Sequence, residues 1–351
     1  MGASVSILGQ GQIGYAIARL FSGTGWDVAV AHRTDKADDD LLDAGSQFTT
    51  LDRNDDAAFR RWLSAGADLL VDTTAYTQLH ARQLLSVQNH VASLCVISSA
   101  SVYRDSEGRS LDEAGTTGFP DLPEQISEDQ PTVAPGDQTY STRKVAMERT
   151  LLDQANVPVT ILRPCAIYGI KSRQPREWWF VKRILDGRRV VPLVFEGKSR
   201  FHTTATENIA ALSRVANQKR FHGVLNVADP DALSASEMAN AIAAAFDYGW
   251  EVKALDEASS QKSVGQHPWA VPRPFVLDMS KAIDLGYEPV TTYSEAAQSY
   301  CTWIADTGRN ADWRKAFPGL PPYLSPDAFD YEMEDAYLGQ LRFETPSQTG
   351  E

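Results

Sequence analysis

The amino-acid sequence predicts an α/β protein with a doubly wound parallel sheet and a smaller α+β lobe. Short apolar runs alternate with segments of helical spacing through the first half of the chain, as in βαβ units. The first apolar run also ends in a glycine-rich loop that opens a helix, an arrangement typical of the first unit of such sheets.

Buried strands are predicted where short apolar runs are bounded by turn residues. These runs are Val5–Leu8, Trp26–Val30, Asp68–Val71, Leu94–Ile97 and Val159–Leu162. Helical spacing is clear in two segments, Ile13–Phe21 and Tyr140–Asp153. Between Arg104 and Asp137 the chain is rich in Gly, Pro and acidic residues, which predicts a long loop that acts as a mobile lid.

These elements divide the chain into a sheet domain and a lobe. We expect residues 1–169 to form the sheet domain, with a strand and a helix near 203–227 returning to it. Residues 170–202 and 228–310 are expected to form the smaller lobe, and residues 311–351 a C-terminal extension.

Composition excludes several classes of protein. The 351 residues carry a net charge of −13, which repels phosphate backbones and argues against a nucleic-acid partner. The three cysteines are far apart and have no metal-type spacing, so we expect neither a disulfide framework nor a metal site. No apolar run approaches the roughly 20 residues that cross a bilayer. We therefore expect a cytoplasmic protein without a membrane partner; formation of a homodimer stays open.

The glycine-rich loop has the sequence Gly9-Gln10-Gly11-Gln12-Ile13-Gly14. Small residues let the backbone approach a pyrophosphate, and the helix N-terminus supplies amide donors. Glycines also serve ordinary tight turns, but the strand–loop–helix context favours a dinucleotide-binding, Rossmann-type domain. Gly9, Gly11, Gln12, Ile13 and Gly14 are the expected cofactor contacts.

The end of the second strand bears on the choice of cofactor. NAD-selective domains usually place Asp or Glu there, whereas this chain has His32 and Arg33. Arg33 is suited to pair with a 2′-phosphate, which favours NADP over NAD. Alternatively, Arg33 is a solvated surface residue.

Tyr140 and Lys144 are the candidate acid/base pair. Their i, i+4 spacing places them on one helix face, and a nearby ammonium lowers the pKa of a phenol. A Tyr-x-x-x-Lys pair also arises by chance in a chain of this composition. Ser99, at the end of a predicted strand, supports the interpretation of Tyr140 and Lys144 as a catalytic pair, because its hydroxyl is suited to orient a reacting oxygen. A turn-closing role for this serine is the alternative.

These motifs, taken in order, resemble an extended, atypical short-chain dehydrogenase/reductase of the NAD-dependent epimerase/dehydratase family. The resemblance runs from residue 1 to about 305 through the segments Gly9–Gly14, Asp68–Ala75, Ser98–Tyr103, Tyr140–Lys144, Leu162–Gly169, Thr206–Ala210, Leu225–Asp229 and Asp278–Ala282. It implies Ser99, Tyr140 and Lys144 as the catalytic triad, Thr74 and Ala75 near the cofactor, and Pro164 on the nicotinamide side.

The chain departs from the family pattern at three places, one in the glycine loop and two in the region expected to bind the substrate. The first glycine of the family's usual loop falls on Leu8, so this loop has the tighter spacing of atypical members. Ala166 replaces the asparagine that is common in nucleotide-sugar enzymes, and Phe201-His202 replace an Arg-Asp pair. The resemblance therefore implies that diphosphate contacts of a sugar nucleotide are partly missing.

Several residues of the predicted lobe are candidate substrate contacts. Arg173, Arg176 and Arg273 are suited to hold an acidic group, Trp178 to stack on a ring, and Arg200 to replace a missing cation. Solvated arginines and a core tryptophan are the alternatives. His202, His222 and His267 have no paired ligand spacing, so core or surface roles are expected.

The sequence supports three hypotheses for function. The first is an NAD(P)-dependent oxidoreductase that transfers a hydride between nicotinamide and a carbinol or carbonyl carbon of a small molecule. The second is a nucleotide-sugar epimerase or dehydratase with a transiently reduced cofactor. The third, a non-catalytic dinucleotide-sensing or RNA-associated relative, is disfavoured by the Ser-Tyr-Lys set and the acidic charge.

Overall fold

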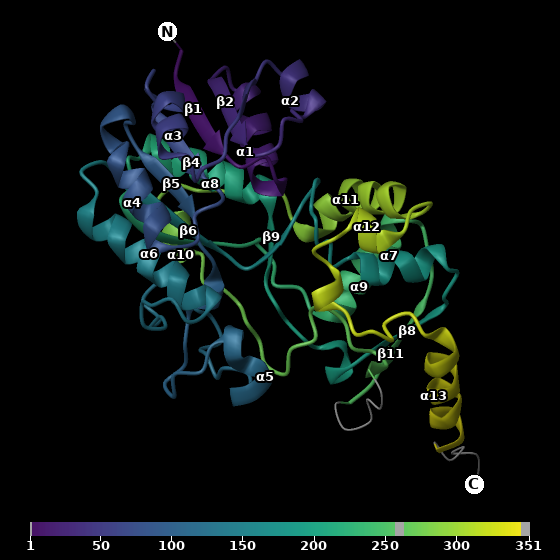
Figure 1. Ribbon diagram of the computed structural model, residues 1–351. Helices are drawn as coiled ribbons and strands as arrows, with labels where there is room; N and C mark the ends of the chain where they lie inside the picture. Colours follow the sequence, from purple (N-terminus) through teal and green to yellow (C-terminus); the bar gives the residue numbers. More distant parts are fainter. Residues whose placement is uncertain (1, 257–262, 345–351) are drawn as a thin grey trace. The chain divides into compact units, whose positions relative to one another are not determined.

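The computed structural model describes residues 2–256 and 263–344 and divides into two compact units (Figure 1). The first unit comprises Met1–Ser172, Phe201–Ala232 and Arg273–Ala296, and the second comprises Arg173–Arg200, Leu233–Pro272 and Ala297–Glu351. The boundaries of these units differ from the expected ones by a few residues at 170–172, 201–202 and 228–232, and more widely at two other places. Residues 273–296 belong to the first unit, and the described part of the C-terminal tail belongs to the second unit.

A parallel seven-stranded sheet forms the centre of the first unit. Its order is β10-β6-β5-β4-β1-β2-β3, with the bounds β10 Gly223–Val227, β6 Val159–Pro164, β5 Leu94–Ile97, β4 Leu69–Asp72, β1 Ser4–Leu8, β2 Asp27–His32 and β3 Gln47–Thr50. The strand order reverses at β1, which lies between β2 and β4. Ligands of open α/β sheets bind at such a reversal, beyond the carboxyl ends of the strands.

The predicted Rossmann-type fold is confirmed, and so are the strands that we expected. Each apolar run became a strand within two residues of its predicted bounds, because parallel strands covered on both faces are continuously apolar. β3 has no counterpart among the predictions. It is an edge strand whose side chains are mostly exposed, so it lacks the apolar pattern of a buried strand.

Helices cover both faces of the sheet (Figure 1). On one face, α1 (Gln12–Ser22) and α8 (Thr206–Gln218) pack around a buried core that includes Ile17, Phe21 and Leu212. The opposite face is covered by α3 (Asp56–Trp62), α4 (Gln78–Ser86) and α6 (Tyr140–Gln154) around a core with Phe59 and Met147. The first unit also contains α2 (Asp39–Asp43), α10 (Ser280–Asp284) and the paired strands β7 (Ala166–Tyr168) and β9 (Thr203–Ala205).

The segment from Arg104 to Asp137 is folded onto the first unit. It contains η3 (Leu111–Glu113) and α5 (Ala114–Thr117), where we predicted only a loop. Buried Asp105 closes its first turn by accepting hydrogen bonds from the amides of Glu107, Arg109 and Asp121. Ile126 is fully buried and forms a parallel bridge with Leu277. The structure therefore shows a segment anchored at both ends and in its middle; the predicted lid motion stays a prediction.

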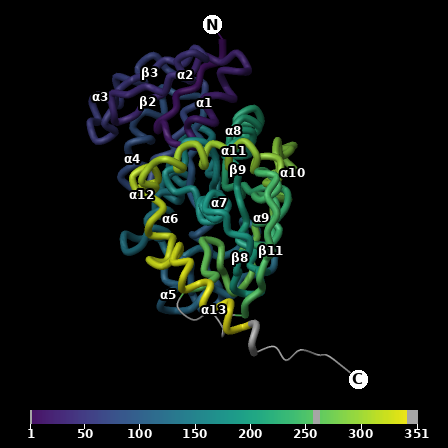
Figure 2. Tube along the Cα trace, turned by 90° about the vertical axis from the view of Figure 1, so that its right-hand side faces the viewer, coloured from purple at the N-terminus to yellow at the C-terminus, as the bar shows by residue number. Residues whose placement is uncertain are grey.

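The second unit is built from two strands and several helices. β8 (Val190–Leu193) and β11 (Glu251–Ala254) pair in parallel and lie side by side in Figure 2. The helices are α7 (Trp178–Leu185), α9 (Ala235–Ala245), α12 (Trp313–Ala316), α13 (Tyr331–Glu344) and α11 (Tyr293–Gly308), which begins in the first unit. Across the described residues, no helix is both long and apolar enough to span a bilayer.

Candidate functional site

The glycine loop follows β1 and requires glycine at two positions. Gly9 has φ +107°, and a Cβ there would lie 2.2 Å from the hydroxyl of Thr73. At Gly14 a Cβ would lie 1.8 Å from the carbonyl oxygen of Gly9. A Cβ at Gly11, in contrast, would meet no atom within 4 Å. The loop is therefore tight on its inner side and open at Gly11, where a ligand can approach the backbone.

The N-terminus of α1 is suited to bind an anion. Gly11 is its N-cap residue and provides no side-chain hydrogen bond, and the first turn carries no acidic residue. The amide oxygens of Gln10 and Gln12 are buried without a hydrogen-bond partner among the described residues. Free amide donors and the helix dipole stabilise a phosphate at such an end. The loop thus fits the pyrophosphate of a dinucleotide, with Ile13 partly buried against the core behind it.

His32 and Arg33 lie at the end of β2, as the sequence predicts. His32 is the last residue of the strand, and its Nδ1 atom lies 3.0 Å from the hydroxyl of Thr34. Arg33 is exposed. Neither residue is a carboxylate, so this end of the strand is open to a 2′-phosphate as well as to a free ribose hydroxyl.

A buried ion pair organises the end of β4. Arg53 lies 3.0 Å from the carboxylate of Asp72 and donates a hydrogen bond of 2.8 Å to the hydroxyl of Thr74. The amide of Thr74 also donates to Asp72. These bonds fix the backbone that leads to Ala75, so both residues expected near the cofactor are held at the carboxyl edge of the sheet.

Lys144 connects α6 to the ends of two strands. Its ammonium donates to the carbonyl oxygens of Ala75, at 2.7 Å, and Ile97, at 2.9 Å. The side chain is almost fully buried, and burial lowers the pKa of the ammonium to about 8. The ring of Tyr76 lies over the same ammonium, with 4.4 Å between Nζ and the ring centre.

Tyr140 occupies the first turn of α6. The helix begins with a capping box, in which Thr139 and Thr142 exchange hydrogen bonds. Tyr140 is 37% exposed, although it is one turn from buried Lys144, and its ring lies 6.0 Å from that of Tyr76. An exposed phenol beside a buried ammonium is accessible to a substrate.

Ser99 is joined to α6 through a chain of hydroxyl groups. Its hydroxyl donates to that of Ser101 at 3.0 Å, and the hydroxyl of Ser141, next to Tyr140, lies 2.9 Å from the same Ser101 oxygen. These contacts bring the Ser99 turn, Tyr140 and Lys144 together near the carboxyl ends of β4 and β5.

A buried ion pair between Arg163 and Glu148 holds α6 against the sheet next to these residues. Arg163 binds both carboxylate oxygens of Glu148, at 3.1 and 2.6 Å, and Ser98 donates to the same carboxylate. Glu148 lies one turn after Lys144 on α6, and Arg163 precedes Pro164 at the end of β6. The pair thus connects α6 to the end of β6 and, through Ser98, to the residues that follow β5.

The candidate substrate residues are divided between the two units. Arg173, Arg176, Trp178 and Arg200 are in the second unit, whereas Arg273 is in the first. Trp178 is buried and contacts Phe317, and Arg176 lies over the ring of Tyr323. Arg273 forms an ion pair of 3.1 Å with Asp121, and both side chains are at least half exposed.

The residues at the family departures have packing roles. Ala166 is buried, and its amide donates to the carbonyl of His202. The imidazole of His202 is also buried and accepts a hydrogen bond from the amide of Leu277 at 3.1 Å. Phe201 packs against Phe275. None of the three side chains is of the charged kind that holds a diphosphate.

Sequence reasoning missed four residues around this site. Tyr76 covers the ammonium of Lys144, and Arg53 forms an ion pair with Asp72. Asp112 accepts a hydrogen bond of 2.7 Å from the amide of Ser141, and Lys171 forms an ion pair with Asp38. Tyr76 follows Ala75 directly, so its position in the sequence was a usable signal. The other three contact residues at least 19 positions away, which no local pattern reveals.

The chain matches the family model described as "NAD dependent epimerase/dehydratase family" over residues 5–228. No curated protein matches the chain by sequence. The family match covers the glycine loop, the strand ends and the residues Ser99, Tyr140 and Lys144.

Solved structures share the fold at low sequence identity. A dTDP-glucose 4,6-dehydratase from Bacillus anthracis in complex with NAD is 15% identical, with a TM-score of 0.65 over 90% of this chain and 99% of that chain. The Thermus thermophilus UDP-glucose 4-epimerase complex with NAD is 18% identical, with a TM-score of 0.63 over 88% and 99%. The UDP-N-acetylglucosamine 4-epimerase from Bacillus cereus is 15% identical, with a TM-score of 0.65 over 86% and 99%.

Proposed function

Because the chain belongs to the NAD dependent epimerase/dehydratase family, we propose that it is an NAD(P)-dependent oxidoreductase acting on a small molecule. The reaction is hydride transfer between nicotinamide and a carbinol or carbonyl carbon. The observation that carries the proposal is the position of Lys144, which is held by the ends of β4 and β5 beside Tyr140 and next to the Ser99 turn.

Each of the three residues has a separate role. When bound, a nicotinamide supplies the hydride acceptor or donor at the reacting carbon. Tyr140 takes the hydroxyl proton during oxidation and returns it during reduction, because its phenol is exposed to substrate. Lys144 binds the cofactor ribose and favours the phenolate by its charge. Ser99 donates a hydrogen bond to the reacting oxygen.

The direct test replaces the proton-transfer group alone. Tyr140→Phe should abolish turnover and leave NADH and NADPH binding largely unchanged, since the glycine loop and Lys144 remain. Tyr248→Phe is the matched control, because its hydroxyl donates to a backbone carbonyl in the second unit. Turnover of Tyr140→Phe within a few-fold of the parent would contradict the assignment.

We also propose NADP as the preferred cofactor. Arg33 is exposed at the end of β2, where an NAD-selective domain has a carboxylate. Four of the structural neighbours have NAD in their titles, which describes those proteins. Arg33→Asp should shift the ratio of the NADPH and NADH dissociation constants toward NADH. An unchanged ratio would make Arg33 a surface residue.

A nucleotide-sugar epimerase or dehydratase is the second candidate. The family name and the titles of the structural neighbours favour it. The apolar or buried side chains at Ala166, Phe201 and His202 favour net oxidoreduction of a different small molecule instead. Calorimetric titration of UDP, dTDP and GDP into the cofactor-loaded protein decides between them. Micromolar binding of any of the three would make the nucleotide-sugar reaction the better proposal.

A further inference from the structure

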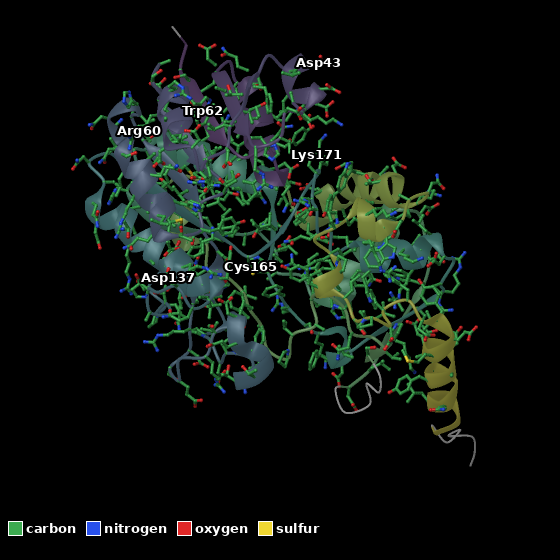
Figure 3. All side chains as sticks on the ribbon, in the orientation of Figure 1. Asp43, Arg60, Trp62, Asp137, Cys165 and Lys171 are labelled. Carbon is green, nitrogen blue, oxygen red and sulfur yellow. The ribbon has the colours of Figure 1, made fainter. Side chains whose placement is uncertain are left out.

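Lys171 forms an ion pair that joins two distant loops of the first unit. Its ammonium lies 2.6 Å from the carboxylate of Asp38, between the loop after β7 and the loop after β2 (Figure 3 labels Lys171). The Asp38 side chain is 11% exposed and that of Lys171 is 37% exposed. Lys171 has φ +70°, a backbone conformation that is unfavourable for a residue with a side chain. The lysine end of this ion pair is open to solvent, which limits what the pair contributes to stability, so the unfavourable backbone at Lys171 suggests a second role for this residue.

The ion pair lies next to the glycine loop. The ammonium of Lys171 is 5.2 Å from the ring centre of Tyr15, and the Tyr15 hydroxyl donates to Asp40 at 3.1 Å. Tyr15 is in the first turn of α1, three residues after Gln12. One helical turn rises about 5.4 Å, so Lys171 is within reach of the amides that fit a pyrophosphate.

The same region needs a cation when an anionic ligand binds. The chain carries a net charge of −13, and the segment Gly9–Gly14 contains no basic residue. The second carboxylate oxygen of Asp38 and the amide oxygen of Gln12 are buried without a hydrogen-bond partner among the described residues. The carboxylates of Asp38 and Asp40, which contact Lys171 and Tyr15, disfavour a pyrophosphate at the N-terminus of α1 unless a cation lies between them.

We propose that Lys171 is a cofactor-binding residue that contacts the dinucleotide pyrophosphate. Asp38 holds its ammonium beside the glycine loop, so the cation is already oriented when the dinucleotide arrives. The inference rests on the proposed function only in that the chain binds a dinucleotide. It assigns a role to a residue outside the glycine loop and outside the Ser-Tyr-Lys set.

Fluorescence titration with NADH tests this role without turnover. Lys171→Met keeps most of the side-chain volume and removes the charge, so it should weaken NADH binding about ten- to hundredfold. Lys171→Arg should bind within a few-fold of the parent. Lys198→Met is the matched control, because Lys198 is exposed and paired with Glu196 in the second unit. The control should leave the NADH dissociation constant unchanged.

Two further ligands separate a pyrophosphate contact from a general loss of structure. ADP contains the pyrophosphate and should lose as much affinity as NADH in Lys171→Met, whereas adenosine should bind both proteins equally. Equal NADH affinity of Lys171→Met and the parent would overturn the proposal, and so would an equal loss for adenosine. If the parent binds neither NADH nor NADPH, the proposed function fails as well, so the two failures are distinguishable.

Discussion

The ammonium of Lys144 lies 4.4 Å from the centre of the Tyr76 ring, which covers it on the side of Tyr140. A cation held over an aromatic face is stabilised by about 0.5–2 kcal/mol. The ammonium donates hydrogen bonds to two backbone carbonyls, and the ring centre of Tyr140 lies farther away, at 5.6 Å. Tyr76 is therefore the nearer aromatic side chain that a substitution can change.

We expect Tyr76→Leu to weaken NADH binding by about three- to thirtyfold, because the ring helps to keep Lys144 charged and in place. Tyr76→Phe keeps the aromatic face and should bind NADH as the parent does. Fluorescence titration of the three proteins checks this. Equal losses in the Phe and Leu variants would show that the hydroxyl of Tyr76, and not its ring, is the important group.

Lys144 gives the protein a pH dependence in the alkaline range. Burial lowers its pKa from the usual 10.5 to about 8 in the folded chain. NADH affinity should therefore fall as the pH rises through about 8, where the ammonium loses its proton. Lys144→Met should bind weakly at every pH and lack this step. A parent affinity that is constant between about pH 7 and about pH 9 would contradict the lowered pKa.

The same lowered pKa affects folding in a defined direction. Between about 8 and 10.5 the unfolded chain keeps a proton that folded Lys144 has released. The free energy of unfolding should therefore rise with pH across this window. In Lys144→Met the free energy of unfolding should rise less steeply over the same range. Urea unfolding of both proteins at several pH values measures the difference.

Asp112 should stabilise the first turn of α6. Its carboxylate accepts a hydrogen bond from the amide of Ser141, and α6 has no acidic residue of its own in that turn. Asp112→Ala should lower the free energy of unfolding by about 1 kcal/mol and lower kcat more than it raises KM, because Tyr140 is in the same turn. Asp112→Asn keeps an acceptor and should restore most of both quantities.

The control for this prediction is Asp121→Ala, a change in the same segment at an exposed ion pair with Arg273. It should change neither kcat nor KM, since Asp121 has no hydrogen bond to α6 among those described. Equal effects of the two alanine variants would mean that the segment as a whole, and not Asp112, supports the helix.

Glu334 should be essential for the stability of the second unit. It binds Arg183, which is almost fully buried and lies 3.5 Å above the ring of Trp179. Removing the partner of a buried charge costs about 3–5 kcal/mol, so Glu334→Ala should unfold at a clearly lower urea concentration. Asp335→Ala removes an exposed partner of Arg188 and should cost less than about 1 kcal/mol. Similar midpoints for the two variants would contradict the prediction.

The strands and the proximity of Tyr140 and Lys144 were predictable because their signals are local. Leu94–Ile97 is apolar at every position and fully buried, and the structure gives the strand the predicted bounds. Tyr140 and Lys144 are four residues apart on one helix, so helical geometry alone brings them together. The glycine loop is likewise a contiguous motif, although the need for glycine at Gly9 comes from its approach to Thr73, beyond β4.

The remaining features depend on contacts between distant segments. Asp38 and Lys171 are more than a hundred residues apart, and neither has an unusual local sequence. Arg53 meets Asp72 only after β4 has paired beside β1. The edge strand β3 was missed because exposed strands carry no apolar pattern. For Trp178 the sequence left ligand stacking and a core role open, and the contact with Phe317 favours the core role.

The two units are interleaved along the chain, and this has a consequence for synthesis. β10 is translated about sixty residues after its neighbour β6, and Leu277, the bridge partner of Ile126, emerges later still. The sheet unit therefore cannot be completed while the ribosome is still adding residues 233–272, which belong to the second unit. The first unit therefore stays incomplete until residues up to about 296 have emerged, and the second unit until later residues have followed. Neither unit can be isolated by a single cut, so limited proteolysis should release fragments that remain associated.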